Sequence, residues 1–143
     1  MDVPPVRWLT RDMSRIIFPN LAVADLEKAK AFYSALGFPV NPQFTDETAS
    51  AIVVSDDIVL MLLSPDFAAE SGLSQPSGAP PISLAFSAES REEVDTLTDK
   101  ALSAGASVRG ETTELGFMYS KGVTDPDGHF LDFVWMDPAA IDS

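Results

Sequence analysis

The stretch NLAVADLEKAKAFYSALGF, Asn20 to Phe38, returns in altered form as SLAFSAESREEVDTLTDKALSAGAS, Ser83 to Ser107. Each copy opens with a short apolar run typical of a strand, continues into a helix with a polar N-cap residue, and stops at a glycine. An internal repeat of this kind indicates a duplicated supersecondary unit. The segments that follow each copy then decide the fold.

The two predicted helices carry matching start and stop signals. In the first copy Asp25 is the expected N-cap and Gly37 the stop. In the second copy Ser90 and Glu93 form a capping box of the S-x-x-E type, and Gly105 ends the helix. Apolar residues at helical spacing predict the buried stripes: Leu26, Ala29, Phe32, Tyr33 and Leu36 in the first helix, and Val94, Leu97, Ala101 and Ala104 in the second.

After each helix the pattern becomes strand-like. The segment ASAIVVSDDIVLMLLSP has two apolar runs around a turn at 55–57, and FMYSKGVTDPDGHFLDFVWMDP has two around a turn at 125–128. Short stretches at 40–44 and 106–109 predict one more strand in each copy. The predicted class is therefore α+β: two β-α-β-β-β modules forming a curved, partly closed mixed sheet with the helices outside.

Composition marks the expected domain boundaries. We expect an N-terminal arm at 1–13, a first module at 14–72, a linker at 73–80 and a second module at 81–143, the modules together making one domain. The linker lies in SGLSQPSGAPP, whose Pro, Gly and Ser content favours no regular element. A chain of 143 residues can bury a sizeable core without disulfides, and this chain contains no cysteine.

The charge balance restricts the partners. Twenty-two acidic residues against nine Lys and Arg give a formal charge of −13, which repels phosphate backbones and anionic lipid and attracts cationic ligands. We expect no nucleic-acid partner. The sequence also has no apolar core of a signal peptide and no apolar run near the roughly 20 residues that cross a bilayer. We therefore predict a cytoplasmic protein without a membrane partner.

The single histidine raises the question of a metal site. His129 lies in TDPDGHFLDF, residues 124–133, three positions before Asp132. Side chains alternate across a regular strand, so two residues an odd number apart face opposite sides and cannot easily share an ion. His129 also follows Gly128 in a turn. We interpret it as a turn and packing residue.

These features together resemble the vicinal oxygen chelate superfamily. The resemblance rests on the strand-helix opening at Asn20 to Phe38, the DPDGH turn followed by an apolar strand, and the duplicated β-α-β-β-β order, and it covers Arg15 to Asp137. That superfamily includes glyoxalases, extradiol dioxygenases, epimerases, fosfomycin-modifying enzymes and bleomycin-resistance binding proteins. The resemblance specifies a fold, and one fold hosts several chemistries.

Enzymes of that superfamily hold a divalent metal with up to four His, Gln or Glu side chains, two from each half, which line a cavity. The resemblance places these positions on Phe18, Met61, Ser83 and Asp132. Only Asp132 is a competent ligand for a hard metal, because a phenyl ring cannot coordinate and a thioether suits soft metals. We therefore expect no metal site and no cofactor.

The resemblance implies a cavity lined by Phe18, Asn20, Met61, Ser83 and Asp132. An isolated buried carboxylate is costly, so Asp132 needs a proton, a hydrogen-bond donor or a cationic ligand. One interpretation is that Asp132 bonds Ser83 or Asn20 and only ties the halves together. Tyr119 and Trp135 are candidate aromatic walls, or else core or dimer-interface residues.

Three functions remain open. The first is a metal-free protein that binds a cationic or amphipathic small molecule against aromatic faces and a carboxylate. The second is a metal-dependent lyase or dioxygenase of glyoxalase type, and the third a metal-independent enzyme with Asp132 as general acid or base. The missing ligands favour the first over the second. The apolar runs AIVV and IVLMLL also lead us to expect a homodimer.

Overall fold

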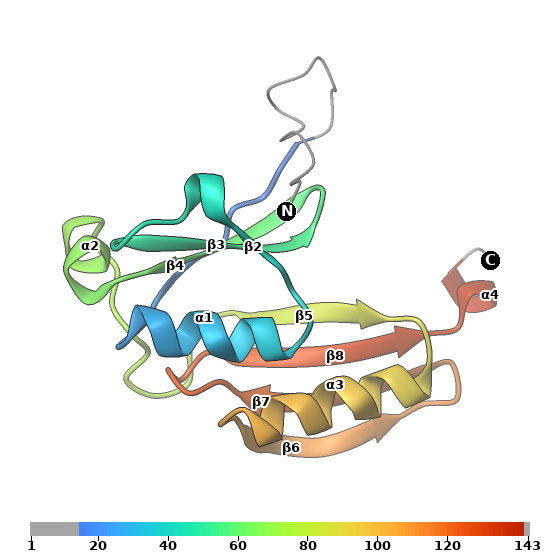
Figure 1. The fold of residues 1–143 in the computed structure, drawn as a ribbon. Helices are drawn as coiled ribbons and strands as arrows, with labels where there is room; N and C mark the ends of the chain where they lie inside the picture. Colours follow the sequence, from blue (N-terminus) through green and yellow to red (C-terminus); the bar gives the residue numbers. More distant parts are fainter. Residues whose placement is uncertain (1–14, 142–143) are drawn as a thin grey trace. The chain divides into compact units, whose positions relative to one another are not determined.

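A computed structural model describes residues 15–141 (Figure 1). The predicted arm at 1–13 lies outside the described residues. The chain divides into two compact units, Met1–Gln75 and Pro76–Ser143, and this division falls within the predicted 73–80 linker. Within the described residues no helix is long and apolar enough to span a membrane.

The first unit holds a four-stranded sheet in the order β1-β4-β3-β2. β1 and β4 are parallel, and the other neighbours are antiparallel. The turn predicted at 55–57 joins β3 to β4. The elements are β1 (Asn20–Ala22), α1 (Leu26–Ala35), β2 (Val40–Asn41), the 3₁₀ turn η2 (Pro42–Phe44), β3 (Ala49–Ser55), β4 (Ile58–Leu63) and α2 (Pro65–Glu70).

The second unit repeats this plan in the order β5-β8-β7-β6. Its elements are β5 (Ser83–Ala88), α3 (Arg91–Ser103), β6 (Ser107–Glu114), β7 (Met118–Thr124), β8 (Phe130–Met136) and α4 (Pro138–Ile141). The predicted α+β class with two β-α-β-β-β modules and mixed strand directions is confirmed. The strands pair within each unit, so the hydrogen bonds form two four-stranded sheets.

Both predicted helix caps are present. The Asp25 side chain accepts a hydrogen bond from the Lys28 amide at 3.0 Å, and Ser90 Oγ accepts one from the Glu93 amide at 3.0 Å. Each helix is followed by a glycine with positive φ, 101° at Gly37 and 115° at Gly105. These glycines adopt the left-handed conformation that commonly ends a helix.

One local prediction needs correction, and one short helix was missed. The strand expected at 40–44 ends at Asn41, because the Asn41 side chain accepts from the Gln43 amide at 2.9 Å and Pro42 starts a 3₁₀ turn. Helix α2 was not predicted. Its signals are Ser64, whose Oγ accepts from the Phe67 amide at 3.4 Å, and Pro65 at the first helical position.

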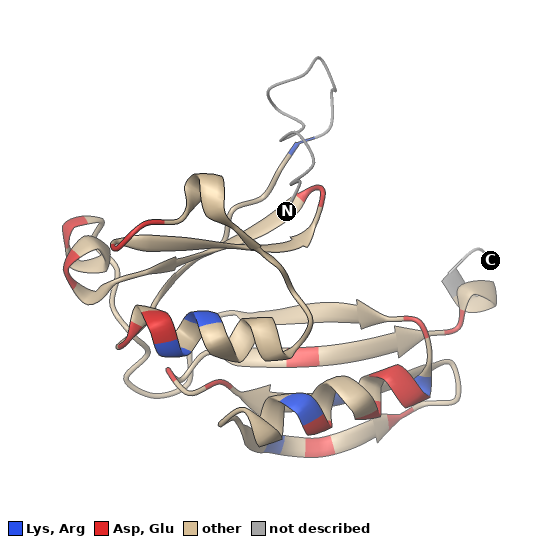
Figure 2. Cartoon of the chain, in the orientation of Figure 1, with Lys and Arg blue, Asp and Glu red and all other residues tan. Residues whose placement is uncertain are grey.

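Each helix buries one face of its own sheet. In the second unit α3 covers one face of the sheet (Figure 1), and Val123, Leu131 and Phe133 are 0 % exposed. In the first unit α1 contacts β3 and β4, where Ile52 and Leu62 are 0 % exposed. Acidic and basic side chains are mixed along α3 (Figure 2). The remaining face of each sheet is where the predicted site residues lie.

Candidate functional site

A row of four residues, one from each strand, crosses the second sheet. In Cα register these are Ala85 on β5, Asp132 on β8, Gly122 on β7 and Arg109 on β6. Residues in register point to the same side of a sheet, so the four share one face. The neighbours of Asp132 in the strand, Leu131 and Phe133, are buried in the core. The row therefore lies on the face away from α3.

The first sheet contains an equivalent row: Asn20 on β1, Met61 on β4, Ala51 on β3 and Asn41 on β2. Because the strand order is the same in both units, Met61 and Asp132 hold equivalent positions in the repeat. Phe18 and Ser83 also correspond, each two residues before the first member of its row. The register thus places Asn20 and Met61 on one face of the first sheet, and Ser83 and Asp132 on one face of the second.

Asp132 forms an ion pair with Arg109, through Oδ1 and Nη2. The two side chains are 26 % and 28 % exposed, respectively. The guanidinium reaches Asp132 from two strands away by passing over Gly122, which has no side chain to block it. A Cβ added at Gly122 would lie 2.8 Å from Asp132 Oδ1 and 2.9 Å from Arg109 Nη2. The same guanidinium lies 4.4 Å above the centre of the Phe130 ring.

This pairing corrects the predicted partner of Asp132. Asp132 was expected to need a proton, a hydrogen-bond donor or a cationic ligand, with Ser83 or Asn20 as one possible donor, but the donor is Arg109. Ser83 is exposed on β5, beside Phe130 in the register. Asn20 uses its amide locally, donating to the Phe18 carbonyl oxygen at 2.8 Å. The missed signal was Gly122, since glycine inside a strand pattern often marks a close approach.

The predicted residues of the first unit form a mostly apolar surface. The Phe18 ring is 42 % exposed, and Met61 is a Cα partner of Asn20. Met61 packs partly against a small cluster formed by Ala22, Ala49, Leu63 and Ala68. An aromatic ring, a thioether and an amide are the groups that this face offers.

Tyr119 and Trp135 lie on the opposite face from Asp132, so their interpretation as walls around it is wrong. Tyr119 Oη donates to Asp95 on α3 at 2.8 Å. Arg91, also on α3, lies 4.4 Å above the Trp135 ring. The odd spacing between 132 and 135 already required this, because side chains alternate along β8.

The charges on the α3 side form a separate set of pairs. Hydrogen bonds from Lys121 and Tyr119 lower the pKa of Asp95. A hydrogen bond from Arg91 lowers the pKa of Glu114 to about 2. These groups stabilise the contact between the helix and its sheet and do not face the row that contains Asp132.

His129 has the turn role that its position predicted. Its amide donates to Asp125 Oδ1 at 2.9 Å, its carbonyl oxygen accepts from the Asp125 amide at 2.8 Å, and its side chain is buried. β8 begins after it, at Phe130. Among residues 15–141, no three His, Asp or Glu side chains are grouped closely enough to hold a metal ion.

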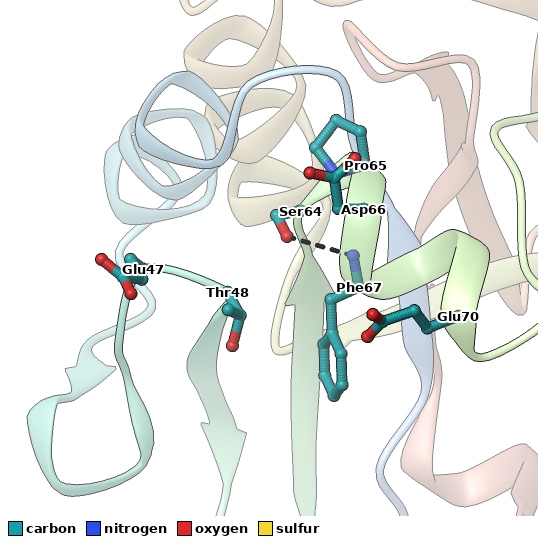
Figure 3. A pocket seen from close by; sticks show the side chains of 7 residues that line it. All are labelled: Glu47, Thr48, Ser64, Pro65, Asp66, Phe67 and Glu70. Atoms are coloured by element: carbon teal, nitrogen blue, oxygen red, sulfur yellow. Dashed lines mark hydrogen bonds between the residues drawn. The ribbon is translucent and has the colours of Figure 1, made fainter.

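A pocket of about 550 Å³ lies at the N-terminal end of α2 (Figure 3). None of the predicted site residues lines it; its walls are Glu47, Thr48, Ser64, Pro65, Asp66, Phe67 and Glu70. Ser64 serves there as the helix cap (Figure 3). Acidic side chains around one exposed phenyl ring offer no built binding geometry, so we place the candidate site on the sheet faces.

Comparison with known proteins places this fold in a family. No curated protein matches the chain. Hypothetical protein SA1046 from S. aureus is 29 % identical with a TM-score of 0.72, over 91 % of this chain and 98 % of that one. A glyoxalase/bleomycin resistance protein/dioxygenase family enzyme from Burkholderia phytofirmans has a TM-score of 0.75 at 20 % identity, over 86 % and 99 %.

The fosfomycin resistance protein FosX from Mesorhizobium loti shares the fold, with a TM-score of 0.66 at 12 % identity, over 94 % of this chain and 99 % of that one. The family model of the Glyoxalase/Bleomycin resistance protein/Dioxygenase superfamily matches residues 15–133. This match spans most of the chain and extends into β8 past Asp132. The chain therefore belongs to the glyoxalase/bleomycin resistance protein/dioxygenase superfamily.

Proposed function

We propose that this protein binds a small organic molecule, without a divalent metal, on the face of the second sheet that carries Ser83 and Asp132. The observation that carries the proposal is the ion pair between Asp132 and Arg109. A carboxylate already paired with a guanidinium in its own unit does not need a metal to balance its charge.

The residues at the expected metal positions do not fit a divalent ion. Met61, equivalent to Asp132 in the repeat, offers a thioether, and Phe18 offers a ring. Hard divalent ions take oxygen and imidazole ligands. Asp132 is the only carboxylate of the set, and Arg109 engages it through Oδ1. These side chains suit contact with an organic molecule better than coordination.

The pair also changes the expected ligand charge. A preference for a cationic molecule followed from an Asp132 without a cation beside it, and Arg109 supplies that cation from within the chain. A general acid or base role for Asp132 has less support, because the other members of its row, Ala85, Gly122 and Arg109, supply no second acid–base group. We therefore propose a binding function and not a catalytic one.

The test combines metal analysis with ligand screening on the purified full chain. We expect less than stoichiometric zinc, nickel and iron by elemental analysis, and small-molecule hits in a thermal-shift screen that persist in EDTA. Asp132→Asn should weaken these hits, whereas Asp95→Asn, which removes a paired carboxylate on the other side of the sheet, should not. One bound metal per chain, or binding that EDTA abolishes, would refute the proposal.

A further inference from the structure

The Arg109–Asp132 pair retains hydrogen-bonding capacity that the described part of the chain does not use. Within residues 15–141 the carboxylate of Asp132 accepts from Arg109 through Oδ1, which leaves Oδ2 as an acceptor. The Nε atom of Arg109 is buried and donates no hydrogen bond, so the donors that a ligand can reach are the N–H groups of the two Nη atoms that Oδ1 does not engage. A guanidinium carries five donors. The pair therefore presents donors and an acceptor side by side.

The Arg109–Asp132 pair carries no net charge. A cation that binds Asp132 competes with Arg109, and an anion that binds Arg109 competes with Asp132. Either ligand must break a contact that is only about a quarter exposed to solvent. An uncharged group does not break the ion pair, because it can form hydrogen bonds to both side chains while they stay in contact.

The surroundings leave room for a planar group. Ser83, Ala85 and Ser87 on β5 are small, exposed and on the same side of the sheet as Asp132. On the opposite side of Asp132 the Arg109 guanidinium lies over Gly122, so the open side of the pair faces β5. Phe130 supplies an aromatic surface beneath the guanidinium. A flat ligand can therefore approach the edge of the pair without meeting a bulky side chain.

We propose that the Arg109–Asp132 pair selects uncharged planar ligands that carry a hydrogen-bond donor and an acceptor on adjacent atoms, as in a primary carboxamide. This inference rests on the proposed binding function and adds the class of ligand. The acceptor of the ligand receives a hydrogen bond from Arg109, and its N–H donates to Asp132. Gly122 is the positioning residue that keeps the pair together.

Three probes of nearly equal shape test the charge rule: neutral benzamide, anionic benzoate and cationic benzamidine. Each is titrated into the full ¹⁵N-labelled chain and followed by backbone amide shifts. We expect benzamide to shift the amides of Ala85, Gly122 and Asp132, and to bind about tenfold more tightly than either charged probe. Equal binding of the three probes, or shifts centred elsewhere, would overturn the inference.

Single substitutions should reverse the preference in opposite directions. Asp132→Asn leaves Arg109 unpaired and should make benzoate the best probe, whereas Arg109→Gln leaves Asp132 unpaired and should favour benzamidine. The double variant, neutral at both positions, should prefer benzamide again. Unchanged preference in a folded single variant contradicts the proposal. A metal-free hit that shifts the amides of this face but shows no preference for an uncharged ligand removes the inference and leaves the proposed binding function standing, whereas a hit whose shifts lie elsewhere contradicts both.

Discussion

Replacing Gly122 with alanine should destabilise the second unit, although a Gly→Ala substitution usually stabilises a protein where the backbone conformation suits alanine. Gly122 lies within β7, and its φ is not among the positive values that favour glycine. Where the backbone is compatible, Gly→Ala stabilises by about 0.4–1 kcal/mol, because it reduces the freedom of the unfolded chain. An ordinary strand glycine would therefore predict a gain.

The contacts at Gly122 reverse this sign. The new methyl group would lie 2.8 Å from Asp132 Oδ1, 2.9 Å from Arg109 Nη2 and 3.0 Å from the Arg109 carbonyl oxygen. The two side chains can move, but the carbonyl belongs to the paired strand and resists. Exposed ion pairs contribute up to about 1 kcal/mol, and breaking a buried one costs about 3–5 kcal/mol. At about a quarter exposure we expect a net loss of about 1–2 kcal/mol after the entropic gain.

Urea unfolding followed by circular dichroism and tryptophan fluorescence measures this loss. Ser120→Ala is the matched control, because Ser120 lies on the same strand and face, two residues from Gly122, and should change the free energy of unfolding by less than about 0.5 kcal/mol. In an Arg109→Ala background the cost of Gly122→Ala should shrink, since one partner of the clash is gone. A Gly122→Ala variant as stable as the parent would show that the methyl group does not clash with the Arg109–Asp132 pair.

Other predictions concern single groups and assembly. Ser50 Oγ is buried without a hydrogen-bond partner among the described residues, so Ser50→Ala should leave the free energy of unfolding unchanged or raise it by about 1 kcal/mol; a clear loss in urea unfolding contradicts this. Arg91 lowers the pKa of Glu114 from 4.5 to about 2, so the stability from Glu114 is fully present above pH 4.5 and is lost as the pH falls toward 2. The gap in melting temperature between the parent and Glu114→Gln should therefore narrow in acid, and a constant gap would show that the pair contributes nothing. We still predict a homodimer, which sedimentation velocity at micromolar concentration would disprove by finding a monomer.

The fold was accessible from sequence because its signals are local and occur twice. Asp25 and Ser90 are caps whose hydrogen bonds join residues three apart, and Gly37 and Gly105 require only a backbone angle. Such signals are independent of tertiary contacts. The family resemblance then followed from the repeated order of elements, and the match over residues 15–133 bears it out.

The ion-pair partner of Asp132 could not be predicted from the sequence. That Asp132 needs a partner follows from electrostatics alone, but the choice of Arg109 depends on strand order and register across three strands. The register shifts between Arg109 and Thr113, which no periodicity in the sequence reports. The glycine between the two charged residues was the one local sign of their approach. Alternation along β8 would also have excluded Trp135 from this face.

The row in the first sheet is equivalent to the row around Asp132 but contains no charged residue. In the first sheet the position of Asp132 is held by Met61, that of Gly122 by Ala51, which is 1 % exposed, and no charge is needed. Replacing a buried ion pair with apolar residues of similar volume is often neutral or stabilising. The fold itself therefore does not require a carboxylate and a guanidinium in the second row. Each of these groups makes the other tolerable there, and recognition of a polar ligand is the role that their unused donors and acceptor support.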